Sequence, residues 1–169
     1  MTFMHPDRVR AARRLAGAFL IVVVLVGMRA PAVRAATQDV SADMAAVGAV
    51  VDAFVRAWSG TAPAELAALL TDDVQAFDIG FTERGRAAVE RRRSELPQRL
   101  QGVRIIESPE LTLSGNLAFA TLTVSGHNDT PSGPMQVWFR CSLVVRRLDG
   151  DWRVDHYHLS GDPDRPRAF

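Results

Sequence analysis

The sequence predicts an α+β domain in which helices precede an antiparallel sheet. Two observations lead to this fold class. Apolar residues recur at helical spacing in the first part of the chain, and consecutive segments after residue 102 alternate like strands. With 169 residues, of which 47% are hydrophobic, the chain has the size and apolar content of one domain with its own core.

The N-terminal segment has the features of a secretory signal. Four arginines between residues 8 and 14 precede an apolar run at 15–28, and small residues follow it. Val33 and Ala35 suit the last positions of a cleavage site after Ala35. We expect residues 1–35 to be a signal peptide of an exported, periplasmic or extracellular protein. The alternative is an uncleaved membrane anchor, although the run is shorter than the ~20 residues that cross a bilayer.

The charge of the remaining chain argues against one class of partner. Removal of residues 1–35 leaves 14 arginines and 18 acidic residues, which changes the net charge from +1 to −4. A mildly acidic domain gives no electrostatic reason to expect binding to nucleic acid. Cys141 is the only cysteine, so no intrachain disulfide can form, and its apolar surroundings predict a small buried side chain.

Three helices are predicted in the first half of the domain, which we expect to span 43–162 after a short linker at 36–42. The first covers 42–58, where apolar residues recur every three or four positions. Pro63 begins a second helix over 63–70, and Gly85 opens a third that ends before Pro97. A short strand over 74–79 and a loop over 80–85 separate the last two helices. The apolar positions of the first helix are Met44, Val47, Val51, Phe54 and Trp58.

The second half is predicted to consist of four antiparallel strands. They cover 103–114, with an interruption at Pro109, then 116–127, 135–148 and 151–160. The dipeptide Asp149-Gly150 is a strong signal for a two-residue hairpin between the last two. Two prolines in residues 163–169 indicate a loose tail.

The last strand contains two histidines, and its alternation assigns them to a face. Strict alternation puts Trp152, Val154, His156 and His158 on one side, with Tyr157 on the other. Regular pairing through the hairpin turn places His158 opposite Cys141. A bulge would instead place the histidines on the same side of the sheet as Arg140 of the 135–148 strand. Both registers are open from the pattern alone.

Four segments together resemble the SnoaL-like branch of the nuclear transport factor 2-like superfamily. They are "AVVDAFVRAW" (49–58), "LLTDDVQAFDIGFTERGRAAVE" (69–90), "VWFRCSLVVRRLDGDWRV" (137–154) and "HYHLSG" (156–161). The last is also similar to the end of the calcium/calmodulin-dependent kinase II association domain. The resemblance covers about residues 44–162. It implies a cone-shaped roll of three N-terminal helices packed on a strongly curved antiparallel sheet that encloses a pocket, and it favours the bulged register.

The resemblance also implies a site. It places Asp78, Trp138, Arg140, His156 and His158 at or near the pocket, and Asp78 where isomerase-like relatives carry a carboxylate base. A carboxylate walled by aromatic side chains has a raised pKa, which suits a general base near neutral pH. The alternative is that Asp78 forms a buried structural ion pair with Arg140 or a histidine. The candidate catalytic residues are therefore Asp78, His156 and His158, and the candidate ligand contacts are Phe77, Trp138 and Arg140.

We expect no metal and no cofactor. His156 and His158 share one strand face, and with Asp78 or His127 they would supply three ligands. No further cluster of histidines or cysteines supports such a site, so imidazoles in the wall of a pocket are the simpler interpretation. Tyr157, the only tyrosine, is predicted to face away from the pocket, which leaves the isomerase pattern without a second proton donor.

The expected partners are a small-molecule ligand and a second copy of the chain. The face of the 135–148 strand formed by Val137, Phe139, Cys141 and Leu143 has no polar side chain, which predicts a homodimer through the outer face of the sheet. The predicted function is binding of a small hydrophobic organic molecule in an internal pocket, with acid/base turnover of isomerase, cyclase or dehydratase type. A non-catalytic ligand-binding or oligomerisation module is the alternative.

Overall fold

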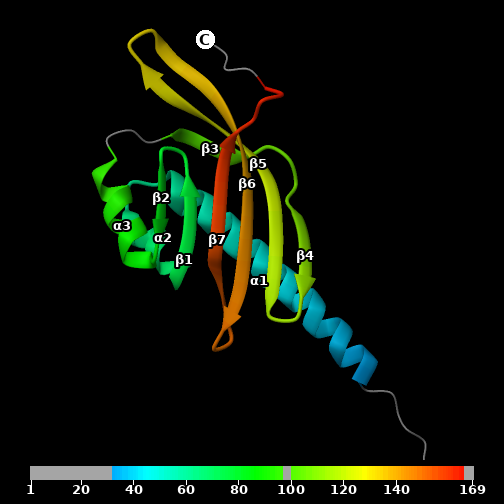
Figure 1. The fold of residues 1–169 in the computed structure, drawn as a ribbon. Coiled ribbons are helices and arrows are strands. Elements are labelled where there is room, and N and C mark those ends of the chain that lie inside the picture. Colours follow the sequence, from blue (N-terminus) through cyan, green and yellow to red (C-terminus); the bar gives the residue numbers. More distant parts are fainter. Residues whose placement is uncertain (1–31, 97–99, 166–169) are drawn as a thin grey trace, which may run out of the picture. The chain divides into compact units, whose positions relative to one another are not determined.

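A computed structural model describes residues 32–96 and 100–165 of the chain, with side chains from residue 39 onward. Within this part, helices precede most of the sheet (Figure 1), which confirms the predicted α+β class. The helices are α1 (Ala32–Ser59), α2 (Pro63–Ala68) and α3 (Arg86–Glu95). The strands are β1 (Leu70–Asp78), β2 (Phe81–Arg84), β3 (Gln101–Ile105), β4 (Glu110–Ser114), β5 (Leu117–Thr130), β6 (Gly133–Leu148) and β7 (Asp151–Gly161).

The seven strands form one curved, unclosed sheet in the order β2-β1-β7-β6-β5-β3, and β4 also pairs with β5. All pairs are antiparallel except β1 with β7, which run parallel. The loop predicted over 80–85 contains strand β2, because Phe81 folds back to pair with Asp78. The strand predicted over 103–114 is divided in two, and its halves pair with opposite ends of β5.

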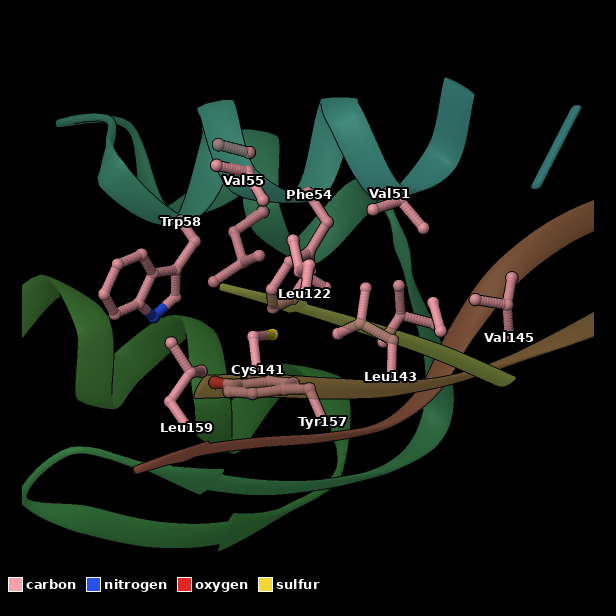
Figure 2. Packing of buried hydrophobic residues seen from close by; sticks show 14 of the residues in the cluster. Val51, Phe54, Val55, Trp58, Leu122, Cys141, Leu143, Val145, Tyr157 and Leu159 are labelled. Atoms are coloured by element: carbon pink, nitrogen blue, oxygen red, sulfur yellow. The ribbon is translucent and has the colours of Figure 1, made fainter. Parts of the chain in front are cut away.

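Helix α1 covers the inner face of the sheet. Its residues Val47, Val51 and Phe54 are almost completely buried, as the helical spacing of apolar residues predicts. In Figure 2, Val51, Phe54, Val55 and Trp58 point from α1 toward side chains of β5, β6 and β7. The helix extends back to Ala32, so residues 36–42, where a linker was expected, are helical.

Two turns rely on backbone conformations that favour glycine. Gly85 has a φ of 90° and precedes α3, where its N–H donates to the carbonyl of Val74 at 2.8 Å. Asp149 and Gly150 have φ values of 51° and 95°, which is the backbone of the tight hairpin predicted between β6 and β7. The first turn fixes α3 beside β1, and the second fixes how β6 and β7 align.

The register of the β6–β7 hairpin contains a bulge at Asp155. Pairing starts at Leu148 opposite Asp151 and is regular as far as Val145 opposite Val154. Beyond the bulge, Val144 faces His156 and Ser142 faces His158. The bulged register that the family resemblance favoured is therefore confirmed, and the two histidines share the face of Arg140.

The face assignment behind the predicted dimer surface was wrong. Val137, Phe139, Cys141 and Leu143 are between 0% and 9% exposed and belong to the hydrophobic core. The physical reason is that α1 needs an apolar partner, and the completely apolar face of β6 buries more hydrophobic surface against it than the mixed face would. The mixed face, with Trp138, Arg140, Ser142 and Val144, is therefore the outer one.

The N-terminal expectations fall mostly on residues that the structure does not describe. The apolar run at 15–28 lies outside the described residues, whereas the cleavage site expected after Ala35 falls within the first residues of α1. Among the helices that are described, none combines the length and the hydropathy needed to cross a membrane.

Candidate functional site

Asp78 is the last residue of β1, and its carboxylate lies between the sheet and the helices. Its side chain is 2% exposed. Oδ2 accepts a hydrogen bond from the indole Nε1 of Trp58 at 2.9 Å and another from the hydroxyl of Tyr157 at 3.1 Å. Oδ1 accepts one from the backbone N–H of Ile79 at 2.7 Å. Three elements, α1, β1 and β7, thus meet at this one carboxyl group.

Arg93 places a positive charge beside this group. It is buried on the inner side of α3, and its nearer guanidinium nitrogen lies 3.9 Å from Oδ2 of Asp78. A second nitrogen donates a hydrogen bond to the backbone carbonyl of Trp58, and the guanidinium lies 5.6 Å from the centre of the Trp58 ring. Arg93 therefore helps to hold Trp58 as well as to balance the charge of Asp78.

Aromatic rings form the walls of the site. The ring of Tyr157 packs against Phe54, with centroids 5.1 Å apart, and Trp58 meets the ring of Phe139 nearly edge-on at 6.2 Å. Figure 2 shows Trp58 and Tyr157 approaching this region from α1 and β7. Such packing fixes the orientations of the two hydrogen-bond donors to Asp78.

The surroundings change the acidity of the groups at the site. Burial raises the pKa of Asp78, while the hydrogen bond from Trp58 and the charge of Arg93 oppose that rise. Burial and the neighbouring charge of Asp78 also raise the pKa of Tyr157, and they raise the pKa of Cys141 to about 12. Cys141 is therefore a buried thiol at neutral pH, as its sequence context predicts, and Asp78 is the group here that can exchange a proton under ordinary conditions.

The two candidate histidines lie on the opposite face of the sheet from Asp78. The ring of Phe77 contacts His156 at 5.4 Å and His158 at 6.2 Å between centroids. Phe77 and Asp78 are neighbours on β1, and Tyr157 lies between the histidines on β7, so alternation sends the two groups to opposite sides. The expectation that Asp78 and the histidines form one site was wrong, because the bulge reverses the alternation.

Arg140 and Trp138, two further candidates, also belong to the outer face. Arg140 forms ion pairs with Asp162, at 3.1 Å, and with Asp164, so it does not pair with Asp78. Trp138 is half-buried, and its backbone carbonyl accepts a hydrogen bond from the N–H of Asp162. A hollow of about 310 Å³ lies next to Arg140, between Glu107, Glu110 and residues 121–123 of β5 and 140–142 of β6.

The metal site considered from the sequence does not assemble. Among the described residues, no group of three or more histidine, cysteine, aspartate or glutamate side chains is placed to hold a metal ion. The ring of His127 lies close to Gly102 of β3, rather than beside His156 and His158.

Sequence reasoning missed three residues of the inner site, namely Trp58, Arg93 and Tyr157. Trp58 was identified only as an apolar position of the first helix, and Arg93 lies in the third predicted helix without an assigned role. For Tyr157 a signal was present. The apolar positions of β7 are 152 and 154, then 157 and 159, and this change of phase marks a bulge between them.

Comparison with known proteins identifies the family. The SnoaL-like domain model matches residues 47–163. No curated protein matches the chain significantly.

Similar solved structures share this fold. An NTF2-like protein with a cystatin-like fold from Novosphingobium aromaticivorans has a TM-score of 0.67 at 15% identity, over 82% of this chain and 94% of that one. A CaMKII hub from S. rosetta has a TM-score of 0.59 at 17% identity, over 69% and 95%. A hexachlorocyclohexane dehydrochlorinase has a TM-score of 0.63 at 14% identity, over 75% and 89%. At these identities the likeness shows the fold alone, and the match of the family model shows that the chain belongs to the SnoaL-like domain family.

Proposed function

We propose that the chain is an acid/base enzyme that acts on a small hydrophobic organic molecule bound on the helix side of the sheet, with Asp78 as the group that moves the proton. The observation that carries this proposal is the buried carboxylate of Asp78, which accepts hydrogen bonds from Trp58 and Tyr157. Reactions of isomerase, cyclase or dehydratase type fit this group, because each transfers a proton from or to carbon or oxygen without a cofactor.

The chemistry follows from the environment of Asp78. Burial makes the ionised carboxylate a stronger base than an exposed one, and the hydrogen bonds from Trp58 and Tyr157 keep it in a fixed orientation. In an isomerisation, the carboxylate removes a proton from the carbon next to a ketone, and the electrons of the C–H bond move into the carbonyl to form an enolate. Return of the same proton to a second carbon completes the reaction, so nothing else is consumed.

A simple probe reaction tests this proposal. Cyclohex-3-en-1-one becomes cyclohex-2-en-1-one when a proton moves between two of its carbons, and the conjugated product absorbs in the ultraviolet. We expect the purified protein to accelerate this or a related reaction of a panel of small cyclic ketones. Asp78→Asn, which keeps the shape of the side chain, should lower kcat by at least about 100-fold.

The same assay compares the inner site with the sequence-based one. His158→Gln alters the outer face and should leave kcat within about a factor of three. If His158→Gln lowers kcat as much as Asp78→Asn does, the histidines take part in the reaction. Binding of panel members without turnover, seen as changes in the NMR signal of the Trp58 indole, would favour the non-catalytic alternative. If no member of the panel is turned over or bound, the proposal is wrong.

We also propose that a second copy of the chain covers the outer face of the sheet. Phe77, Leu117 and Phe119 are 42–48% exposed there, and they flank His156 and Val144. Large apolar side chains exposed together on one face mark a surface that a partner can cover. The hub and association domains among the similar structures are named for assembly, which supports the idea.

A pair of matched variants tests the dimer. Phe119→Glu should produce a monomer in light scattering at tens of micromolar, with little change in the free energy of unfolding. Val40→Glu alters an apolar side chain of similar exposure on α1 and should remain dimeric. Wild-type protein that is monomeric at this concentration would rule the dimer out.

Export completes the proposed function. The basic, apolar and small-residue segments of residues 1–35 support processing after Ala35. Mass spectrometry of the fraction outside the cytoplasmic membrane should find a mature N-terminus near Ala36. Protein that retains Met1 and stays in the cytosol would refute export.

A further inference from the structure

The two oxygens of the Asp78 carboxylate have different surroundings. Oδ2 accepts from Trp58 and from Tyr157, and the guanidinium of Arg93 lies on the same side. Oδ1 accepts only from the N–H of Ile79 among the hydrogen bonds of the described residues. A carboxylate oxygen has two lone pairs. Both lone pairs of Oδ2 are therefore used by the described residues, and one lone pair of Oδ1 is not used by any of them.

The donors at Oδ2 are held firmly in place. The indole Nε1 of Trp58 can donate a hydrogen bond but cannot accept one, so it excludes a proton from its side of Oδ2. Trp58 is in turn fixed by Arg93 at its carbonyl and by the ring of Phe139. Tyr157 is completely buried against Phe54. Protonation of Oδ2 would break one of these bonds or force the hydroxyl of Tyr157 to turn.

We propose that Asp78 takes up and releases its proton at Oδ1, and that Trp58 and Tyr157 are positioning residues that hold Oδ2. This deepens the proposed function and depends on it for the reaction itself. A substrate proton then arrives at the free lone pair of Oδ1, next to the bond from Ile79, while the carboxylate plane stays fixed. The base is oriented before the substrate binds, which lowers the reorganisation that proton transfer needs.

The charged and titratable groups around Asp78 come from three elements. Arg93 faces it from α3, Tyr157 from β7 and Cys141 from β6. Arg93 keeps its charge at every accessible pH, and the pKa values of Tyr157 and Cys141 are raised. Below about pH 10, the protonation change at this cluster therefore belongs to Asp78. Loss of either donor at Oδ2 removes a contact that favours the ionised carboxylate, so it raises the pKa of Asp78 further.

Neutron diffraction tests the assignment directly, without a substrate. Crystals of the wild-type protein would be equilibrated in deuterated buffer above and below the midpoint at which Asp78 titrates. We expect the deuteron that appears at the lower pH on Oδ1, with the bonds from Trp58 and Tyr157 still directed at Oδ2. A deuteron on Oδ2, with the hydroxyl of Tyr157 turned to accept it, would overturn the proposal.

NMR of conservative variants supplies a second, independent test in solution. The pKa of Asp78 would be followed through its carboxyl carbon, and Tyr157, the only tyrosine, through its ring carbon next to oxygen. Tyr157→Phe removes one oxygen atom and should raise the pKa of Asp78, while the Trp58 indole still responds to its titration. Trp152→Phe is the control, since Trp152 is also buried on β7 and its Nε1 lacks a hydrogen-bond partner among the described residues. An unchanged pKa in Tyr157→Phe would contradict the role of Tyr157.

Kinetics separate this inference from the proposed function. With an active ketone substrate, Tyr157→Phe should lower kcat roughly 10-fold to 100-fold and change KM by less than about 3-fold. The acidic limb of its pH–rate profile should move upward with the pKa of Asp78. If the wild-type protein turns over no ketone but the deuteron lies on Oδ1, the proposed reaction is wrong and the proton position is right. If turnover is normal but the deuteron lies on Oδ2, the proposed reaction is right and the proton position is wrong.

Discussion

The two faces of the β6–β7 hairpin carry different chemistry although both are formed by the same two strands. The inner face presents Cys141, Leu143, Tyr157 and Leu159 to α1, all less than 5% exposed. The outer face presents Arg140, Ser142, His156 and His158, which are half-buried or exposed. The residue types that most often perform chemistry thus lie on the outside, and the inner face contributes a tyrosine among apolar side chains.

Burial explains why the inner face is the better candidate site. On the inside, loss of water raises the pKa of Asp78 and makes each hydrogen bond to it matter. On the outside, Arg140 pairs with Asp162 and Asp164 while its side chain is 52% exposed, so water and salt weaken these contacts. The comparison teaches that the surroundings of a polar group, rather than its residue type, decide whether it can act as an acid or base.

The largest expected effect tests which face is the core. Leu143→Ala removes a side chain that is 0% exposed and should lower the free energy of unfolding by about 2–5 kcal/mol. Val144→Ala, the next residue on the outer face, should cost less than about 1 kcal/mol. Urea denaturation of both variants measures the difference. A larger loss at Val144 than at Leu143 would restore the face assignment that the sequence first suggested.

The sequence predicts the elements well because each one depends on local patterns. The helical spacing around Val51 and Phe54, the proline that begins α2 and the turn at Asp149-Gly150 all appear in the structure as expected. The position of Asp78 at a pocket was implied by the family resemblance rather than by a local pattern. Parallel pairing of β1 with β7 was not predicted, because it joins segments far apart in the chain and leaves no local signal.

The rest of the candidate site depends on a single inserted residue. Alternation was applied to β7 without a break, which assigned His156 and His158 to the inside and Tyr157 to the outside. Asp155 interrupts the alternation, since it is bulged out opposite Val144 and Val145. Every side chain that follows therefore changes face, and a site predicted from strict alternation loses its histidines and gains a tyrosine.

A deletion of Asp155 tests this explanation. Removing the bulged residue makes the hairpin regular, with Val154 inward, His156 outward and Tyr157 inward, so the faces should be retained. The hydrogen bond from Thr71 to Asp155 and the ion pair from Arg146 are lost, which should cost about 1–3 kcal/mol of unfolding free energy. Urea denaturation measures the loss of unfolding free energy, and the NMR signal of Tyr157 shows whether its side chain stays buried. Exposure of Tyr157 in the deletion variant would show that the bulge does not set the faces in this way.

The inner face should also make stability depend on pH through Asp78. Its pKa in the folded protein lies above 3.8, the ordinary value for an aspartate. Between pH 3.8 and the higher folded pKa, the folded state keeps a proton that the unfolded state has released, so the free energy of unfolding falls as pH rises. The slope from one group cannot exceed about 1.4 kcal/mol per pH unit. The contribution is complete below pH 3.8 and is lost as pH rises through the folded pKa.

Asp78→Asn isolates this contribution. The difference in unfolding free energy between wild-type protein and the variant, measured by urea denaturation from pH 3 to pH 8, should change in favour of the variant as pH rises and then become constant. A difference that is flat over this range would mean that burial does not raise the pKa of Asp78.

The smallest expected effect lies on the outer face. Partial burial and the charge of His158 lower the pKa of His156, and Asp155 opposes them. His158→Gln removes the repulsive charge and should raise the pKa of His156 toward its usual value, which two-dimensional NMR titration can follow. Ser142→Ala is a control beside the pair that removes no charge, and it should leave the pKa of His156 unchanged. If His158→Gln leaves the pKa of His156 where it is, the two imidazoles do not interact. The outer face would then carry separate surface histidines, and its contrast with the hydrogen-bonded cluster around Asp78 would be sharper still.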